Sequence, residues 1–177
     1  MNAHSNLQFL ILESNDDLKE FEENIYYNFV ERHPDKYIIN EYFIEDKKAR
    51  PKIPYSDLII YAVKKNNKII AGIALNKNME IMQVKDISKD FNLPISAKCI
   101  EGIILFINDK TGENPFELGF NFRKEYESYL SKLGYECYIA TCNKEKLKLY
   151  LKIGGELIGE VINRYNESEY IILRKLK

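Results

Sequence analysis

Two apolar segments separated by a long helix constrain the fold of this chain most. Cys99–Ile107 is a mostly apolar run that is typical of a buried strand, and Tyr135–Thr141 is a second one. Residues 115–133 between them have the pattern of a helix. A strand, a helix and a strand in this order predict two neighbouring parallel strands with a right-handed crossover.

The residues at both ends of this helix support its assignment. Asn114 suits the N-cap, Pro115 suits the first helical position, and Glu117 stands where a capping-box acid belongs. Gly134 follows the last helical residue, as is common at helix C-termini.

The remaining segments predict a mostly antiparallel arrangement. The clearest is a hairpin in which Leu58–Lys64 and Lys68–Leu75 flank Asn66-Asn67, because asparagine tolerates the positive φ of a tight turn. The other predicted elements are, in chain order, strand Leu7–Leu12, a helix that Ser14 caps and His33-Pro34 ends, an irregular helix and loop over residues 36–56, a connection of uncertain structure over residues 76–98, a short helix that Asn143 caps and Gly154-Gly155 end, and the strands Glu156–Arg164 and Ser168–Leu176. No linker divides these elements, so we expect a single α/β domain over residues 1–177.

The composition argues against several classes of function. The chain has 177 residues, of which 45% are hydrophobic, and this is enough for one core. Its net charge of -1 favours neither a nucleic-acid nor a membrane surface. The first residues lack the pattern of a signal peptide, and no apolar run reaches the ~20 residues of a membrane helix. We therefore expect a cytoplasmic protein with no nucleic-acid or membrane partner.

The cysteines and histidines indicate neither a disulfide framework nor a metal site. The three cysteines, Cys99, Cys137 and Cys142, have no metal-ligand spacing. Only His4 and His33 are present, which excludes a multi-histidine site. We expect reduced, inert thiols and no metal.

Three segments in this order resemble the GCN5-related N-acyltransferase (GNAT) superfamily over nearly the whole chain. The first is Ile69–Ala74, which is similar to the family's third strand with its glycine. The second is the Cys99–Gly134 unit, which stands in the place of the cofactor-binding strand, loop and helix. The third is the spacing of Asn143, Tyr150 and Gly154, similar to the family pattern N-x-x-A-x-x-L-Y-x-K-x-G-F.

The resemblance implies a fold and a donor. It implies a GNAT-like mixed, mostly antiparallel central sheet with a splayed parallel strand pair and flanking helices. In that fold the pantetheine arm of acetyl-CoA or another acyl-CoA bonds the backbone of the first parallel strand. The cofactor-binding residues carried over in this way are Leu105, Phe106, Ile107, Gly119, Arg123 and Asn143.

The family's pyrophosphate loop is only partly retained. The loop reads Q/R-x-x-G-x-G/A, and here Asn114, Glu117 and Gly119 stand at its three motif positions, so that only Gly119 matches. This departure leaves a second interpretation open, in which the chain is a non-catalytic GNAT-like domain that binds a ligand or a partner.

Glu101 and Tyr150 are the candidate catalytic residues. Glu101 lies among apolar neighbours that would raise the pKa of its carboxyl group, and it is the base candidate. Acyl-homoserine lactone synthases and N-acyl amino acid synthases carry a similar glutamate in an E-x-S-R setting, although Gly102-Ile103-Ile104 follows here. Tyr150 stands at the family's position for the acid that protonates the thiolate. The alternatives are a solvent-facing strand end for Glu101 and core packing for Tyr150.

Those two groups of relatives also suggest acyl carrier protein as an acyl donor. The lysines on or near the last helix could dock this acidic protein, or they could form an ordinary solvated face; they are Lys144, Lys146, Lys148 and Lys152. The resemblance thus implies transfer of an acyl group from a pantetheine thioester to a small-molecule primary amine by direct attack.

Overall fold

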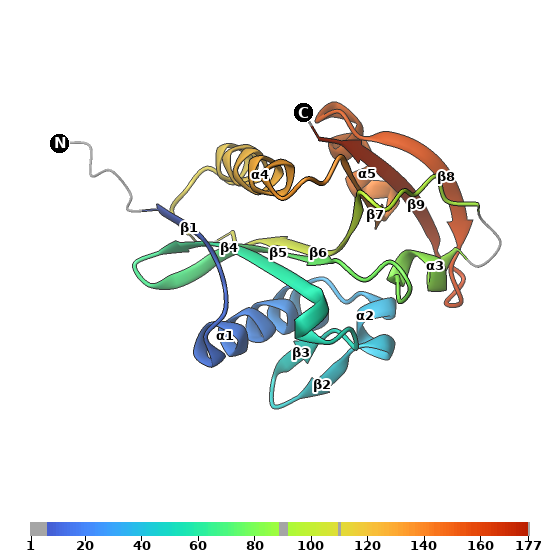
Figure 1. Ribbon diagram of the computed structural model, residues 1–177. Coiled ribbons are helices and arrows are strands. Elements are labelled where there is room, and N and C mark those ends of the chain that lie inside the picture. The colour runs from blue at the N-terminus through green and yellow to red at the C-terminus, as the bar shows by residue number, and fades with distance from the viewer. Residues whose placement is uncertain (1–6, 89–91, 110, 177) are drawn as a thin grey trace. The chain divides into compact units, whose positions relative to one another are not determined.

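A computed structural model describes residues 7–88, 92–109 and 111–176 (Figure 1). His4 and residues 89–91 of the predicted 76–98 connection lie outside the described residues. Seven strands form one hydrogen-bonded sheet in the order β1-β4-β5-β6-β7-β9-β8, and β2 and β3 form a separate two-stranded sheet. The chain divides into two compact units, one of residues up to Ala74 together with Ile104–Tyr126, the other of Leu75–Ile103 together with Glu127–Lys177.

The first unit begins with strand β1 (Leu7–Ile11), which pairs antiparallel with β4 (Leu58–Lys65). Helix α1 (Asn15–Tyr26) follows and continues through a π-helical segment, η1 (Tyr27–Arg32). Ser14 caps α1 as predicted, because its hydroxyl oxygen accepts a hydrogen bond from the backbone N–H of Asp17 at 3.2 Å.

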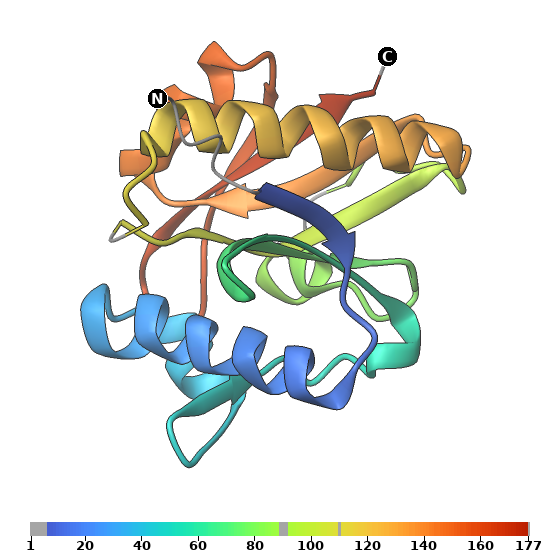
Figure 2. The same cartoon turned by 90° about the vertical axis from the view of Figure 1, so that its left-hand side faces the viewer.

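A short hairpin follows helix α2 (Lys36–Glu41) and lies next to α1 (Figure 2). Its strands are β2 (Phe43–Glu45) and β3 (Lys48–Arg50), and a 3-10 turn, η2 (Tyr55–Asp57), leads on to β4. The sequence predicted an irregular helix and loop over residues 36–56; α2 confirms the helix, whereas the loop was wrong where this hairpin forms. The turn residues Asp46 and Lys47 have φ of 49° and 58°, and nothing in an Asp-Lys pair signals such a turn as strongly as Asn-Gly would.

The predicted hairpin at Asn66-Asn67 is confirmed. Strand β5 (Lys68–Asn76) is the neighbour of β4 in the sheet, and the two asparagines have φ of 51° and 61°. Gly72 of β5 is required by packing: a Cβ atom there would lie 2.6 Å from Phe21 and 2.8 Å from Phe106. The two phenylalanine rings pack on each other with centroids 5.4 Å apart.

Helix α4 (Pro115–Lys132) has the predicted ends. The side-chain oxygen of Asn114 accepts hydrogen bonds from the backbone N–H groups of Phe116 (3.0 Å) and Glu117 (3.3 Å), and Gly134 has a φ of 88°. On the first turns of this helix, Phe122 packs against the rings of Tyr61 and Tyr126.

The second unit holds the parallel strand pair. Strands β6 (Cys99–Ile107) and β7 (Cys137–Cys142) run parallel, in register from Cys99↔Cys137 to Gly102↔Ala140. The predicted parallel pair is therefore confirmed. The pairs β1–β4, β2–β3, β7–β9 and β8–β9 are antiparallel.

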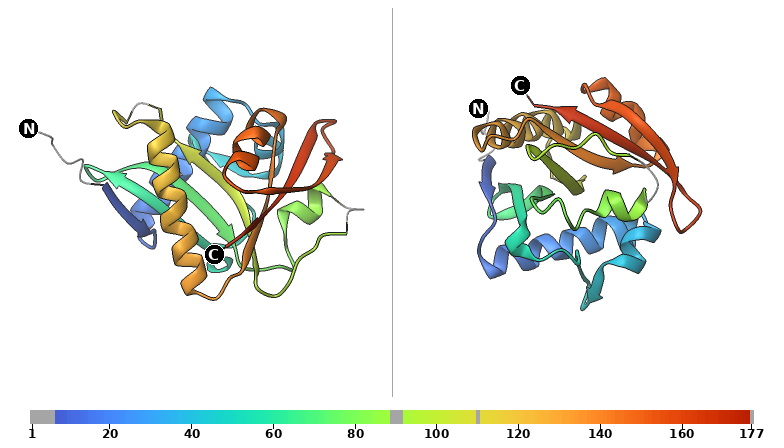
Figure 3. Two further views of the ribbon diagram at one scale, coloured as in Figure 1. Left: turned by 90° about the horizontal axis from the view of Figure 1, so that it is seen from above. Right: turned by 45° about the vertical axis from the view of Figure 1, so that its right-hand side comes forward.

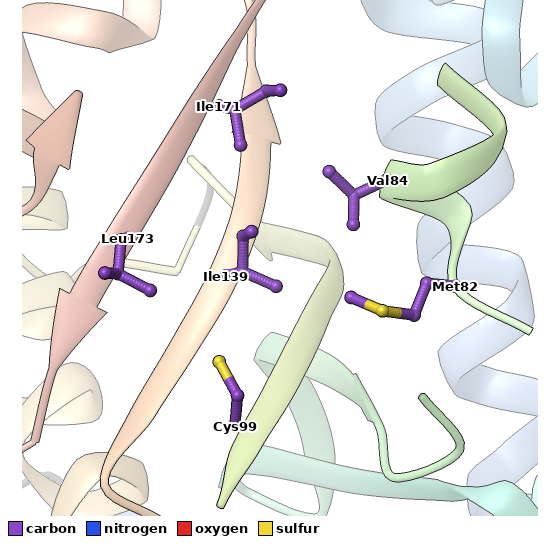
Figure 4. Close-up of a cluster of buried hydrophobic side chains, with 6 residues drawn as sticks. All are labelled: Met82, Val84, Cys99, Ile139, Ile171 and Leu173. Atoms are coloured by element: carbon purple, nitrogen blue, oxygen red, sulfur yellow. The ribbon is translucent and has the colours of Figure 1, made fainter. Parts of the chain in front are cut away.

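Strand β9 (Ser168–Lys175) joins β7 to β8 (Glu156–Ile162), and helix α5 (Lys144–Lys152) packs against β8 and β9 (Figure 3). A short helix, α3 (Gln83–Ile87), forms within the connection that the sequence left open. Met82 and Val84 at its start join Cys99, Ile139, Ile171 and Leu173 in one buried cluster (Figure 4).

No helix among residues 7–88, 92–109 and 111–176 combines the length and the hydropathy that crossing a bilayer requires.

Candidate functional site

Glu101 is a buried carboxyl group in the second unit. It is the third residue of β6, and only 1% of it is exposed. Its Oε2 atom accepts a hydrogen bond from Nδ2 of Asn76 at 2.8 Å, and its Oε1 atom accepts one from the backbone N–H of Val84 at 2.6 Å. Glu101 is therefore not a solvent-facing strand end.

Hydrogen bonds orient the side chain of Asn76 so that its amide nitrogen faces Glu101. It is the last residue of β5 and is fully buried. Its Oδ1 atom accepts from the backbone N–H of Asn78 at 2.9 Å, and its Nδ2 atom also donates to the carbonyl oxygen of Ile81 at 3.2 Å. Since a backbone N–H can only donate, the oxygen of the amide points to Asn78 and the nitrogen points to Glu101.

Burial raises the pKa of Glu101 from 4.5 to about 7. The hydrogen bonds from Asn76 and from the backbone of Val84 and Gln83 oppose this rise, as does the charge of Lys85. The rise that the sequence predicted therefore occurs, and it leaves the carboxyl group able to gain or lose a proton near neutral pH.

Helix α3 covers Glu101 and is fixed by several contacts. Val84 supplies the N–H group to Glu101 and packs on the cluster around Ile139. Lys85 donates to the carbonyl oxygen of Met79 at 2.5 Å, and Asp86 forms an exposed ion pair with Arg164. Sequence reasoning missed Asn76 and the Val84 amide, because a single polar residue at the end of an apolar strand carries no signal of what it binds.

Tyr150 lies on α5 against Cys142, Tyr170 and Ile172. Burial, with Tyr138 and Cys142 close by, raises the pKa of its hydroxyl group, so that it stays protonated at neutral pH.

Glu101 and Tyr150 contact opposite faces of the strands in this unit. Glu101 is the register partner of Ile139, which packs toward α3, whereas the alternate residues Tyr138 and Cys142 face Tyr150. The structure thus does not bring the two candidate catalytic side chains together on one face.

Asn143 and the lysines of α5 lie at the other end of that helix and along it. The Oδ1 atom of Asn143 accepts from the backbone N–H of Lys146 at 3.1 Å, so the side chain serves as the N-cap. All four lysines named above are exposed.

The other predicted cofactor residues lie in the first unit. Phe106 is buried against Phe21, whereas Leu105 and Ile107 are partly exposed. A Cβ atom on Gly119 would lie 2.8 Å from Cδ1 of Ile107, so packing between α4 and β6 already accounts for this glycine.

The start of α4 does not fit a pyrophosphate group in the family's usual way. Asn114 already accepts from the N–H groups of Phe116 and Glu117, and the Glu117 side chain lies in the first turn. A phosphate there would have to displace the cap and approach a like charge. Arg123 and Lys124 lie over the ring of Phe120, 5.2 and 4.4 Å from its centroid.

Among the residues that the structure describes, no group of three or more histidine, cysteine, aspartate or glutamate side chains could hold a metal ion.

Comparison with solved structures identifies the fold. The acyl-homoserine lactone synthase LasI matches with a TM-score of 0.78 at 13% identity, over 98% of this chain and 91% of LasI. The CoA-dependent acyl-homoserine lactone synthase BjaI, solved with SAM and isopentyl-CoA, matches with a TM-score of 0.73 at 11% identity, over 92% of this chain and 77% of BjaI. FeeM, an N-acyl amino acid synthase from uncultured soil microbes, matches with a TM-score of 0.63 at 10% identity, over 97% of this chain and 91% of FeeM.

The predicted fold class is confirmed by these likenesses. A candidate acetyltransferase of the GNAT family is among the other matches, and the chain has the GNAT fold, similar to that of the acyl-homoserine lactone and N-acyl amino acid synthases. In sequence, no protein-family model and no curated protein matches the chain.

Proposed function

We propose that this chain is an N-acyltransferase that moves an acyl group from a pantetheine thioester to a primary amine, with Glu101 as the general base. The observation that carries the proposal is the buried carboxyl group whose pKa is raised to about 7 and whose two oxygens are held by Asn76 and Val84. A base poised near neutral pH is what removal of a proton from an ammonium group requires.

The proposed reaction needs a base and an acid. Ionised Glu101 takes a proton from the ammonium group of the acceptor, and the amine then attacks the thioester carbonyl carbon. A C–N bond forms and the C–S bond breaks; Tyr150 gives its proton to the thiolate, and the second proton of the nitrogen restores the tyrosine hydroxyl group. Because Glu101 and Tyr150 contact opposite faces of the strands, this mechanism requires a thioester that is reached by the base from one face and by the acid from the other. The products are an amide and a free thiol, and no covalent enzyme intermediate is involved.

The donor and the acceptor are proposed by class. BjaI is a CoA-dependent synthase that was solved with isopentyl-CoA and with SAM, which carries a primary amine, and this supports an acyl-CoA donor and a small-molecule amine acceptor. Because Asn114 occupies the amides at the start of α4, we propose that recognition depends on the acyl-pantetheine part more than on the pyrophosphate. Acyl carrier protein, docked on the exposed lysines of α5, is the alternative donor.

Activity measurements on two variants test the assignment. Glu101→Gln should lower kcat by about 10²- to 10⁴-fold, as expected for the loss of a general base. Tyr150→Phe should slow turnover while donor binding is retained. The matched control is Glu136→Gln, which changes an exposed carboxylate on the approach to β7. Mass spectrometry of the amide product would measure the rates, and a Glu101→Gln variant as fast as the parent would refute the role of the base.

The second candidate is a non-catalytic GNAT-like domain that binds a ligand or a partner. The cap that Asn114 forms with the first amides of α4 favours it. Thermal unfolding should be recorded with acetyl-CoA, with a longer acyl-CoA and with acyl carrier protein, each added separately. A shift with any of these donors together with amide formation would exclude this candidate.

A cytoplasmic location and a single domain over residues 1–177 both stay predictions.

A further inference from the structure

Two cysteines that are 38 residues apart in sequence meet at the start of the parallel strand pair. Cys99 is the first residue of β6, Cys137 is the first residue of β7, and the two are register partners. Their Sγ atoms lie 2.9 Å apart. Cys99 is buried, in the cluster of Figure 4, and Cys137 is partly exposed.

The backbone already has the spacing that a disulfide bond needs. Hydrogen-bonded neighbouring strands lie about 4.8 Å apart, and a disulfide bond joins Cα atoms about 4.4 to 6.8 Å apart. Register partners also project to the same face of a sheet, so the two Cβ atoms point the same way. To form the bond, the two sulfur atoms would have to approach from 2.9 Å to about 2.05 Å.

The third cysteine has a different environment. Cys142 is the last residue of β7, is the register partner of Tyr170 and packs against Tyr150. Burial raises the pKa of its thiol group to about 11, and burial raises the pKa of the Cys99 thiol as well, so what distinguishes Cys142 is its position at the opposite end of β7 from the Cys99–Cys137 pair. Cys142 therefore serves as an internal control, a thiol that is expected to stay reduced when Cys99 and Cys137 are oxidised.

We propose that Cys99 and Cys137 form a redox-active dithiol that a peroxide or a low-molecular-weight disulfide converts into an intramolecular disulfide bond. This modification site is independent of the proposed acyl transfer, since neither sulfur belongs to the catalytic groups. It differs from the expectation from sequence that Cys137 is an inert packing thiol.

The chemistry with hydrogen peroxide balances in two steps. Cys137, the more exposed thiol, attacks one peroxide oxygen as its thiolate; the O–O bond breaks, one water leaves and a sulfenic acid forms. The sulfur of Cys99 then attacks the sulfur of Cys137, the S–S bond forms, and the hydroxyl group leaves as a second water with the proton of the Cys99 thiol. Two thiols are oxidised by two electrons, and one peroxide is reduced to two waters.

Thiol counting and mass spectrometry test the proposal on the full chain. After treatment with hydrogen peroxide and removal of the excess, titration of the denatured protein should find one thiol in place of three, and the intact mass should fall by about 2 Da. Dithiothreitol should restore all three thiols.

Single variants identify the bond. Cys142→Ser should still lose both remaining thiols, whereas Cys137→Ser should lose none to an internal disulfide bond. Cys137 is partly exposed, so its replacement avoids disturbing the core as Cys99→Ser would. Retention of three thiols after oxidation, or an internal bond that persists in Cys137→Ser, would overturn the assignment. Acyl transfer is not measured here, so failure of the proposed function leaves the result unaffected.

Discussion

The carboxyl group of Glu101 experiences two opposing influences on its pKa. Its surroundings exclude water almost completely, which favours the neutral form, while Asn76 and the Val84 amide direct donors at its oxygens and favour the ionised form. Burial is the larger influence, and the pKa reaches about 7. This one residue should therefore link protonation both to stability and to activity.

Stability should fall as pH rises through the range from 4.5 to about 7. The folded state holds the Glu101 proton more tightly than the unfolded state, whose carboxyl group has the ordinary pKa of 4.5. Folded molecules therefore bind more protons in this window, and the free energy of unfolding decreases with pH by an amount on the order of 3 kcal/mol. Urea unfolding of the parent and of Glu101→Gln at several pH values would measure the pH-dependent part of their stability difference, which should level off below the window. A constant difference between the two proteins from pH 4 to 8 would contradict the shift.

Replacing Asn76 by leucine should raise the pKa of Glu101 further. The change removes the donor to Oε2 and leaves the Ile81 carbonyl and the Asn78 N–H without this partner, so the protein should also lose about 2 to 3 kcal/mol of stability. A ¹³C NMR titration of the Glu101 carboxyl group would report the pKa without any assay of activity. Asn121→Leu, at an exposed position of α4, is the control and should leave the titration unchanged.

The sequence predicted Glu101 but not the residues that hold it. Its position within an apolar strand was enough to predict burial and the direction of the pKa shift. Asn76 lies 25 residues earlier, and its contact with Glu101 depends on the neighbouring strands and on the path of residues 77–84. The same limit applies to Cys99 and Cys137, whose contact depends on the register of two strands that a helix separates.

At the scale of elements, caps and turns carry the local information. Asn114→Ala removes the acceptor for the N–H groups of Phe116 and Glu117, and it should lower the stability of the protein by about 1 kcal/mol. Chemical denaturation followed by circular dichroism would measure the loss. Asn121→Ala makes the same substitution inside the helix, where alanine is the better helix former, and it should cause no loss. Equal losses in the two variants would show that the cap contributes nothing.

The elements that the sequence predicted well are those with a chemical signal at their ends. Asn66-Asn67 marked one hairpin, and Asn114, Asn143 and Gly134 marked helix ends that the structure confirms. The β2–β3 hairpin was missed because its strands have three residues each and its turn lacks glycine and asparagine. Helix α3, with five residues and no side-chain cap, left no periodic pattern to detect.

For the whole molecule, the division into two units and the path of the chain make a clear prediction. The boundaries fall inside β5, inside β6 and inside α4, so three continuous elements belong to both units. Neither unit can lose its structure without disrupting an element of the other, and we expect one cooperative unfolding transition. Circular dichroism and tyrosine fluorescence should give the same midpoint in urea. Two separate midpoints would contradict this coupling.

The order of elements was enough to predict the fold, because a strand–helix–strand unit among antiparallel hairpins has few arrangements. The chemistry was less predictable, since it depends on side chains that only the three-dimensional arrangement brings together. The likeness to LasI and FeeM therefore supports the fold at identities of 13% and 10%, where residue-by-residue comparison has little power.

The hydrogen bond from Val84 to Glu101 also affects how readily this carboxyl group exchanges its proton with solvent. Glu101 is 1% exposed, so exchange of its proton with bulk water requires a local opening, and we expect an opening at α3 to break the bond from the Val84 amide. The rate of hydrogen–deuterium exchange at the Val84 amide should then report how often the site opens for an acceptor amine to reach Glu101.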